Sequence, residues 1–599
     1  MPLKISAPSA QVSFLHFGRT PRRAAHALAL IGAIALAAPA FAEAQAASPL
    51  QLEAFSSPDG NYLAGLVAGA EHDTAGAALF LAGTLSADPG NAQLMERTFV
   101  ALLSNGNMNQ AFDVADRLLK QDANNSLAQL VLGVKAVKAK QFSKARGDFQ
   151  KSGSKSDLTA NLLAAWSYAG AGQTKKALAT LDGLKQDRFE VFRDYHEGLI
   201  EELAKNPAQA RPLLKAAYDA DSQTLRIVDA WARFNDRNGD PTEAKRAYQA
   251  FDKLLPRHPL VVAALAELAA GKKLQPLIRS PQAGAAEVLY GLGAAGGQQS
   301  DDLAAMIYLR LALYLAPHNA LAKITLADLY ERLNQHESAI QLYESVPKTS
   351  PLRGNAEVQI ALITDELGRH GAALKQLGAI VSKKPDDVEA LTALANLQRS
   401  HSDFAAAADT YTKVLAKTGG DSVKSNWSIL YFRGICNERL NHWPVAEADF
   451  KQALALFPNQ PLVLNYLGYS WVNKGLHLNA GFKMLRKAVQ LQPDDGYIVD
   501  SLGWAYYKLG KYKHAQRELE KAVQLKPADP TLNEHLGDID WRLGHKLEAH
   551  FQWNYARDFG PDPKNLPRIL QKIAHGMPPR NLPAASDGQP ASQPAKTGG

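Results

Sequence analysis

Residues 496–561 decide the fold, because they contain the same pattern twice. They read GYIVDSLGWAYYKLGKYKHAQRELEKAVQLKPAD, followed by PTLNEHLGDIDWRLGHKLEAHFQWNYARDFGP. Four residues spaced 12, 7 and 5 apart in the first copy recur 34 positions later in the second: Gly503, Ala515, Ala522 and Pro527 match Gly537, Ala549, Ala556 and Pro561. A repeat of this length, with free variation between its fixed positions, indicates a helical solenoid.

Alanines extend this period over most of the chain. They recur at intervals of 32 to 34 residues in two series: Ala77, Ala111, Ala145, Ala177, Ala210 and Ala244, then Ala305, Ala339, Ala373 and Ala407. A small residue at the crossing of two antiparallel helices lets their backbones approach, whereas a large one would separate them. One such hairpin buries little surface by itself, so stability accumulates through its neighbours. The series predicts an all-α array of stacked helix pairs.

Breaks in the period divide the chain. Gly271, residues 274–281 and the glycines of residues 291–296 interrupt it, and a shorter loop contains Gly419 and Gly420. The region around the first break is either an atypical repeat or a hinge. The predicted segments are a signal peptide (1–42), a lead-in (43–57), an N-terminal array (58–259), the atypical repeat or hinge (260–302), a middle array (303–416), a loop (417–426), a C-terminal array (427–561), a capping helix (562–576) and a disordered tail (577–599).

The N-terminus has the pattern of an export signal. Basic residues at 19–23 precede an apolar run at 24–38, and Ala40-Phe41-Ala42 forms a small-x-small cleavage site. We therefore expect a periplasmic protein cleaved after Ala42 and associated with the outer membrane through its partners; an uncleaved anchor is the alternative. No cysteine follows the cleavage site, so we do not expect a lipid anchor.

Composition argues against several other classes of function. The formal charge is +7, and removing the four basic residues of segment 1–42 leaves about +3, too little to predict a nucleic-acid partner. Cys436 is the one cysteine, which excludes an intramolecular disulfide and suggests a buried apolar side chain. Stability must therefore come from packing.

The fixed positions resemble those of the tetratricopeptide repeat (TPR) family. That pattern has a small residue at position 8, an aromatic at 11, alanine at 20 and 27, an aliphatic or aromatic residue at 24 and proline at 32. Gly503, Tyr506, Ala515, Leu519, Ala522 and Pro527 occupy these places in order. The resemblance implies a right-handed TPR superhelix (α-solenoid) of about 14 repeats over residues 58–561 that binds other proteins.

The C-terminal repeats, which include Asn465-Tyr466-Leu467-Gly468-Tyr469, are also similar to exported TPR proteins of Gram-negative bacteria. One of these is an outer-membrane lipoprotein adaptor of a periplasmic carboxyl-terminal processing protease. The resemblance implies a scaffold in the cell envelope whose partners are proteins such as an envelope protease. Membership of a polysaccharide assembly or secretion complex is the alternative function.

In this family the first helix of each repeat lines the binding groove, chiefly through positions 2, 5, 9, 12 and 13. Carried onto the last four repeats, these positions give a protein-binding groove formed by Tyr431, Asn465, Tyr469, Asn473, Asp500, Trp504, Tyr507, Glu534, Asp538 and Trp541. Aromatic side chains supply contact area, and asparagine can bond a peptide backbone. The alternative is that several of the aromatics pack between repeats.

Position 5 carries Asn465, Asp500 and Glu534, whose acidic members would repel the C-terminal carboxylate that some chaperone-binding TPR domains hold. We therefore expect extended or basic segments as ligands.

No catalytic or metal motif is complete in the sequence. Gly291-Leu292-Gly293-Ala294-Ala295-Gly296 matches the dinucleotide fingerprint by letter but lacks the preceding strand. His336-Glu337 has no second histidine at the spacing of a zinc helix, and the other histidines are scattered. We expect a non-enzyme with no metal, no cofactor and no small-molecule substrate.

Overall fold

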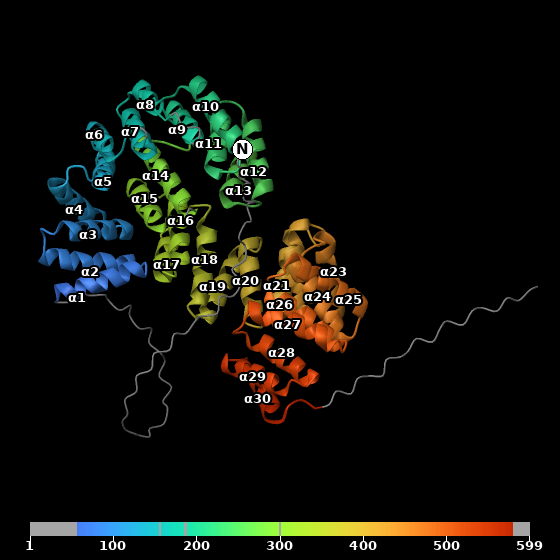
Figure 1. Ribbon diagram of the computed structural model, residues 1–599. Coiled ribbons are helices and arrows are strands. Elements are labelled where there is room, and N and C mark those ends of the chain that lie inside the picture. Colours follow the sequence, from blue (N-terminus) through green and yellow to red (C-terminus); the bar gives the residue numbers. More distant parts are fainter. Residues whose placement is uncertain (1–56, 155–156, 185–188, 299–300, 579–599) are drawn as a thin grey trace, which may run out of the picture. The chain divides into compact units, whose positions relative to one another are not determined.

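The structure is a computed structural model that describes residues 57–154, 157–184, 189–298 and 301–578. Within these ranges the regular elements are thirty α-helices and one short 3-10 helix, η2 (Lys424–Asn426), shown in part in Figure 1. The helices are α1 (Pro58–Ala70), α2 (Thr74–Ala87), α3 (Ala92–Asn105), α4 (Met108–Gln121), α5 (Ser126–Lys138), α6 (Phe142–Ser152), α7 (Leu158–Gly170), α8 (Thr174–Leu181), α9 (Glu190–Leu203), α10 (Pro207–Ala220), α11 (Leu225–Arg237), α12 (Pro241–Leu254), α13 (Pro259–Ala269), α14 (Pro281–Gln298), α15 (Asp302–Leu315), α16 (Ala320–Arg332), α17 (His336–Glu344), α18 (Arg353–Glu366), α19 (His370–Lys383), α20 (Val388–Ser400), α21 (Phe404–Lys417), α22 (Trp427–Arg439), α23 (Trp443–Leu456), α24 (Pro461–Lys474), α25 (Leu478–Leu491), α26 (Gly496–Lys508), α27 (Tyr512–Leu525), α28 (Pro530–Leu543), α29 (Lys546–Asp558) and α30 (Leu566–His575).

Consecutive helices form fourteen pairs. The pairs run from α1–α2 to α11–α12 and from α14–α15 to α28–α29, while α13 and α30 are single helices. The predicted all-α array of about 14 helix-turn-helix units is confirmed. The predicted signal peptide, nearly all of the lead-in and most of the predicted tail fall outside the described residues. No helix in the described ranges is long and apolar enough to span a bilayer.

Local hydrogen bonds set where the helices begin. Asp529 Oδ1 accepts the backbone N–H groups of Thr531 and Leu532 at 2.9 and 3.1 Å. Asp495 does the same at the start of α26. These carboxylates satisfy N–H groups that have no partner within the helix. The turn between the two helices of a pair passes through the left-handed region, as at Gly510 with φ of 73°, which glycine adopts without steric cost.

Small residues lie where paired helices cross. A Cβ atom at Gly503 would lie 2.7 Å from Leu519 Cγ, and one at Gly537 would lie 2.6 Å from Trp553 Cδ1. The alanines that mark the repeat are fully buried, including Ala515, Ala522, Ala549 and Ala556. The side chain opposite each glycine fills the space that a larger residue would need. The spacing of small residues in the sequence therefore follows from how the two helices of a pair pack.

Replacing Ala515 with Trp should overpack the crossing of α26 and α27. We expect the C-terminal pairs to lose about 1–3 kcal/mol of unfolding free energy or more, because the buried site cannot expand without moving both helices. Urea denaturation and hydrogen exchange of α26–α28 would measure the loss. The control is Lys513→Trp, at an exposed position of α27. Equal midpoints for the two variants would contradict this register.

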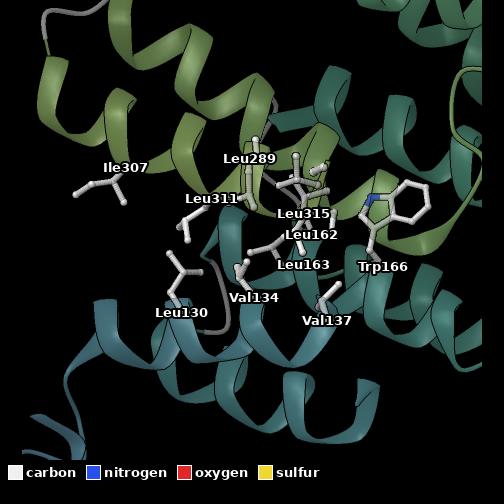
Figure 2. Close-up of a cluster of buried hydrophobic side chains, with 14 of the residues drawn as sticks. Leu130, Val134, Val137, Leu162, Leu163, Trp166, Leu289, Ile307, Leu311 and Leu315 are labelled. Atoms are coloured by element: carbon white, nitrogen blue, oxygen red, sulfur yellow. The ribbon is translucent and has the colours of Figure 1, made fainter. Parts of the chain in front are cut away.

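The sequence analysis gave two alternatives for the region 260–302, an atypical repeat and a hinge. The region contains α13, a non-helical stretch and α14. α14 pairs with α15, and both pack against first helices of earlier pairs: α3, α5, α7 and α9. Figure 2 shows Leu130 and Val134 of α5 and Leu163 of α7 in one apolar cluster with Leu311 of α15. The hairpin α14–α15 therefore covers the face that the first helices of the N-terminal array present.

The glycine-rich letters of residues 291–296 lie inside α14 and form no loop. A Cβ at Gly293 would lie 2.7 Å from Leu309 Cγ and 3.2 Å from the Ala305 carbonyl oxygen. At Gly284, one turn from the start of the same helix, a Cβ would overlap the ring of Trp166 at 2.2 Å. These glycines serve the close approach of α14 to α15 and α7.

A buried ion pair with α11 and a hydrogen bond from α9 hold α14 in place. Glu287 Oε1 and Oε2 accept hydrogen bonds from Arg226 of α11 at 2.8 and 2.6 Å, and Tyr195 of α9 donates to Oε1 at 2.9 Å. Burial alone would raise the pKa of Glu287, but Arg226 and these hydrogen bonds hold it below its usual value. The carboxylate stays ionised because its partners replace the water that it has lost.

Replacing Glu287 with Ala should leave the Arg226 guanidinium with only its longer contact to Asp229, at 3.4 Å. We expect a cost of about 3–5 kcal/mol, the range for breaking one side of a buried pair. The readout is the urea midpoint of the N-terminal pairs, together with hydrogen exchange of α14. Glu267→Ala, at an exposed position on α13, is the matched control and should leave both unchanged. A wild-type midpoint for Glu287→Ala would show that α14 does not depend on this pair.

Candidate protein-binding groove

All ten predicted groove residues lie on first helices of the last four pairs, α22, α24, α26 and α28. Their surroundings differ. Asn473 is exposed, Asn465, Tyr469, Trp504 and Trp541 are half-buried, and the others are buried. Six of the ten fall into three groups: Tyr431 in an aromatic core, Asp500, Trp504 and Tyr507 in or beside an aromatic stack, and the acidic pair Glu534 and Asp538, which α30 covers.

Tyr431 belongs to the core. Its ring lies 5.2 Å from that of Phe432, 5.9 Å from that of Tyr466 and 6.1 Å from that of Phe450, and only 9% of the residue is exposed. This is the packing that the alternative interpretation of the aromatics described. On the next first helix, Asn465 Oδ1 is buried and has no hydrogen-bond partner among the described residues.

Trp504 is stacked between Tyr507 and His535. The ring centroids are 4.7 and 4.2 Å apart, with interplanar angles of 21° and 22°. His535 Nδ1 lies 2.8 Å from Asp500 Oδ1, so the stack is tied to a buried carboxylate of the preceding repeat. Burial would lower the pKa of His535, but the charge of Asp500 and the hydrogen bond to it raise this pKa above its usual value. Sequence positions alone did not select His535.

The Asp500–His535 pair should make the stability of α26–α28 depend on pH. Because the pKa of His535 is higher folded than unfolded, its contribution is complete below about pH 6 and is lost as pH rises through the raised pKa. Hydrogen exchange of α26–α28 between pH 5.5 and 8.5, corrected for intrinsic exchange rates, measures this loss. His535→Gln should flatten that part of the profile, and His318→Gln, at an exposed position, should not. An unchanged profile for His535→Gln would exclude this pair as the cause.

The third group consists of Glu534 and Asp538 on α28. Basic side chains of α30 bind both carboxylates. Arg568 of α30 donates two parallel hydrogen bonds of 2.8 Å to Glu534, and Lys572 Nζ lies 2.6 Å from Glu534 Oε1 and 2.7 Å from Asp538 Oδ1. Glu534 and Asp538 are only 2% and 4% exposed. Two basic residues one helical turn apart therefore neutralise two carboxylates one turn apart.

The residues after α30 extend this contact. Trp541 Nε1 donates a 3.0 Å hydrogen bond to the Met577 carbonyl oxygen, and Arg542 donates one of 2.7 Å to that of Pro578. A Cβ at Gly576, whose φ is 70°, would lie 2.0 Å from Trp541 Cζ2. The helix expected within 562–576 is thus present as α30, and it seats on the predicted groove surface of the last repeat. Arg568 and Lys572 were not selected from the sequence, although their spacing marks a basic helix face.

Cys436 has the surroundings of a structural residue. It is fully buried, and burial raises the pKa of its thiol to about 11. The thiolate that nucleophilic chemistry requires is therefore scarce at neutral pH. The prediction of a buried apolar side chain is confirmed.

Comparison with known proteins identifies similar repeats in parts of this chain. Profiles of the tetratricopeptide repeat match residues 359–422 and 437–496 and, separately, residues 499–529. The TPR repeat-containing protein PA4667 of Pseudomonas aeruginosa is 34% identical over 92 residues, which are 15% of this chain and 16% of that protein. The aligned region thus spans about a sixth of that relative.

Solved structures of TPR and related helical proteins also align. A tetratricopeptide repeat protein of Parabacteroides merdae has a TM-score of 0.37 at 17% identity and covers 43% of this chain and 99% of that chain. The Cut9–Hcn1 tetramer of APC/C gives 0.36 at 15% identity, covering 81% and 96%, and yeast Tom70 gives 0.32 at 12% identity, covering 87% and 95%.

The helix pairs and their spacing define an α-helical repeat protein. The matched segments show that residues 359–422, 437–496 and 499–529 consist of tetratricopeptide repeats.

Proposed function

We propose that this chain is a non-catalytic scaffold whose C-terminal array binds basic helical segments of partner proteins. The observation that carries the proposal is the contact of α30 with the first helix α28. The buried carboxylates of Glu534 and Asp538 need cationic partners, and a helix with Arg and Lys four residues apart provides them. A partner segment of the same pattern could take the place of α30 or continue its contacts along α26 and α24.

The position of the open surface supports the same proposal. In the N-terminal array, α14 and α15 pack on the first helices α3, α5, α7 and α9. In the C-terminal array, Asn473 is exposed and Tyr469 is half-exposed, so the first helix α24 offers surface that a partner segment can contact.

The test uses a labelled peptide of residues 564–578 and the full chain. In the double variant Arg568→Glu, Lys572→Glu, repulsion from Glu534 and Asp538 should release the chain's own α30. We expect this variant to bind the peptide, and the unaltered chain to bind it at least tenfold more weakly because its own helix competes at high effective concentration. Fluorescence anisotropy measures both.

Two controls make the result decisive. Adding Glu534→Gln and Asp538→Asn to the double variant should remove peptide binding, and a peptide with both basic residues changed to Glu should not bind. Equal binding of the two peptides would contradict a groove that selects basic segments.

We further propose that the scaffold works in the cell envelope and presents partner proteins there, as an adaptor of a protease would. The export pattern of residues 1–42 and the resemblance of the C-terminal repeats to exported TPR proteins support this location. N-terminal sequencing of the protein from fractionated cells tests it: a mature chain beginning at Glu43 in the periplasmic fraction is expected, and a full-length chain in the cytoplasm would contradict it. Crosslinking in intact cells, followed by mass spectrometry, would identify the partners.

A further inference from the structure

Three side chains from two neighbouring repeats converge at the turns of the middle array. Asp365 lies in the last turn of α18, His370 is the first residue of α19, and His401 follows α20. Asp365 Oδ1 is 2.6 Å from His370 Nδ1 and 2.8 Å from His401 Nε2. These three atoms all lie within 4.8 Å of one another, and the two imidazole rings are 4.1 Å apart at 50°.

We propose that Asp365, His370 and His401 form a binding site for a divalent transition-metal ion such as Zn²⁺. Two imidazole nitrogens and one carboxylate oxygen are a common zinc ligand set, and each nitrogen here already points at the carboxylate. Tetrahedral zinc with bonds of about 2.0–2.2 Å holds its ligand atoms about 3.3 Å apart. The nitrogen–oxygen distances, now 2.6 and 2.8 Å, would have to widen by roughly 0.5–0.7 Å, a movement that the exposed histidine side chains can make.

The local backbone explains how the ligands meet. Gly368, with φ of 77°, reverses the chain between α18 and α19 and returns His370 toward Asp365. Ser402, with φ of 64°, occupies the equivalent place in the next repeat, directly after His401. The two turns therefore lie side by side in register, and their side chains project to the same edge of the array.

His401 occupies a position that varies among the repeats and is leucine in several of them. The residue before the left-handed turn position is leucine in five other turns: Leu333, Leu367, Leu440, Leu509 and Leu543. The fold therefore does not require a histidine at this position, and leucine can occupy it without altering the turn. The imidazole of His401 instead gives the second repeat a ligand that faces those of the first.

The donor set and exposure indicate which ions would bind. Nitrogen ligands favour Zn²⁺, Cu²⁺, Ni²⁺ and Co²⁺ over Mg²⁺ and Ca²⁺, which prefer oxygen. The side chains of His370 and His401 are 51% and 30% exposed, so water or a ligand from a partner protein can complete the coordination. Bound metal would join two consecutive repeats and stiffen the array between α18 and α21.

The test is metal titration of the full chain, purified with a tag that contains no histidine and stripped with a chelator. Isothermal titration calorimetry should show one equivalent of Zn²⁺ bound, and Co²⁺ should give the visible absorption bands of a low-symmetry site. We expect Zn²⁺ to raise the melting temperature and to slow hydrogen exchange at residues 365–402, and Mg²⁺ to do neither.

Variants localise the site. His401→Leu keeps the residue type of the five equivalent turns, so it should fold normally and bind Zn²⁺ at least tenfold more weakly, as should His370→Ala and Asp365→Asn. His318→Ala, at an exposed position in another turn, should bind like the unaltered chain. Absence of Zn²⁺ binding by the unaltered chain, equal binding by His401→Leu, or equal binding of Mg²⁺ would each overturn the proposal.

Discussion

Every repeat of this protein depends on the close approach of two helix backbones. Gly503 and Gly537 leave room only for the side chains opposite them, Leu519 and Trp553, and the marker alanines of both repeats are fully buried. A single added methyl group would meet neighbouring atoms inside van der Waals distance at these points. Because the helices of a pair are packed against each other in this way, the face of the first helices is the surface that we propose for binding.

The chain covers part of that face itself, by similar means at two places. The hairpin α14–α15 lies on first helices of the N-terminal array, with Glu287 ion-paired to Arg226, and α30 lies on α28, with Arg568 and Lys572 paired to two carboxylates. Buried carboxylates without partners would be costly, so each contact includes a cation, which α11 supplies in the first case and α30 in the second. The two contacts differ in the exposure of the arginine: the side chain of Arg568 is 56% exposed and that of Arg226 is 18% exposed. The C-terminal cover is therefore the one a competing segment could replace.

The placement of the ten candidate residues on first helices could be predicted from the sequence, because first-helix positions follow directly from the repeat register. Whether each of these side chains is buried, and which partner it contacts, could not be predicted. Tyr431 proved to be a core residue, Trp504 is stacked between neighbours, and Glu534 is paired with α30, since each depends on residues one repeat or more away. His535 and Lys572 belong to these groups but occupy no position that the repeat pattern marks. The roles of His535 and Lys572 depend on which side chains of a neighbouring helix lie opposite them.

The sequence by itself determined the fold class, the pairing of helices and the residues at each crossing, because a TPR is a local structure whose period is written along the chain. Only the tertiary structure decided what the breaks in that period do. Residues 281–298 form a helix that packs on segments more than a hundred residues earlier, and histidines that look scattered, His370 and His401, meet beside Asp365. Periodicity encodes contacts between neighbours. Contacts between distant segments depend on how successive repeats are rotated against one another, which no local pattern records.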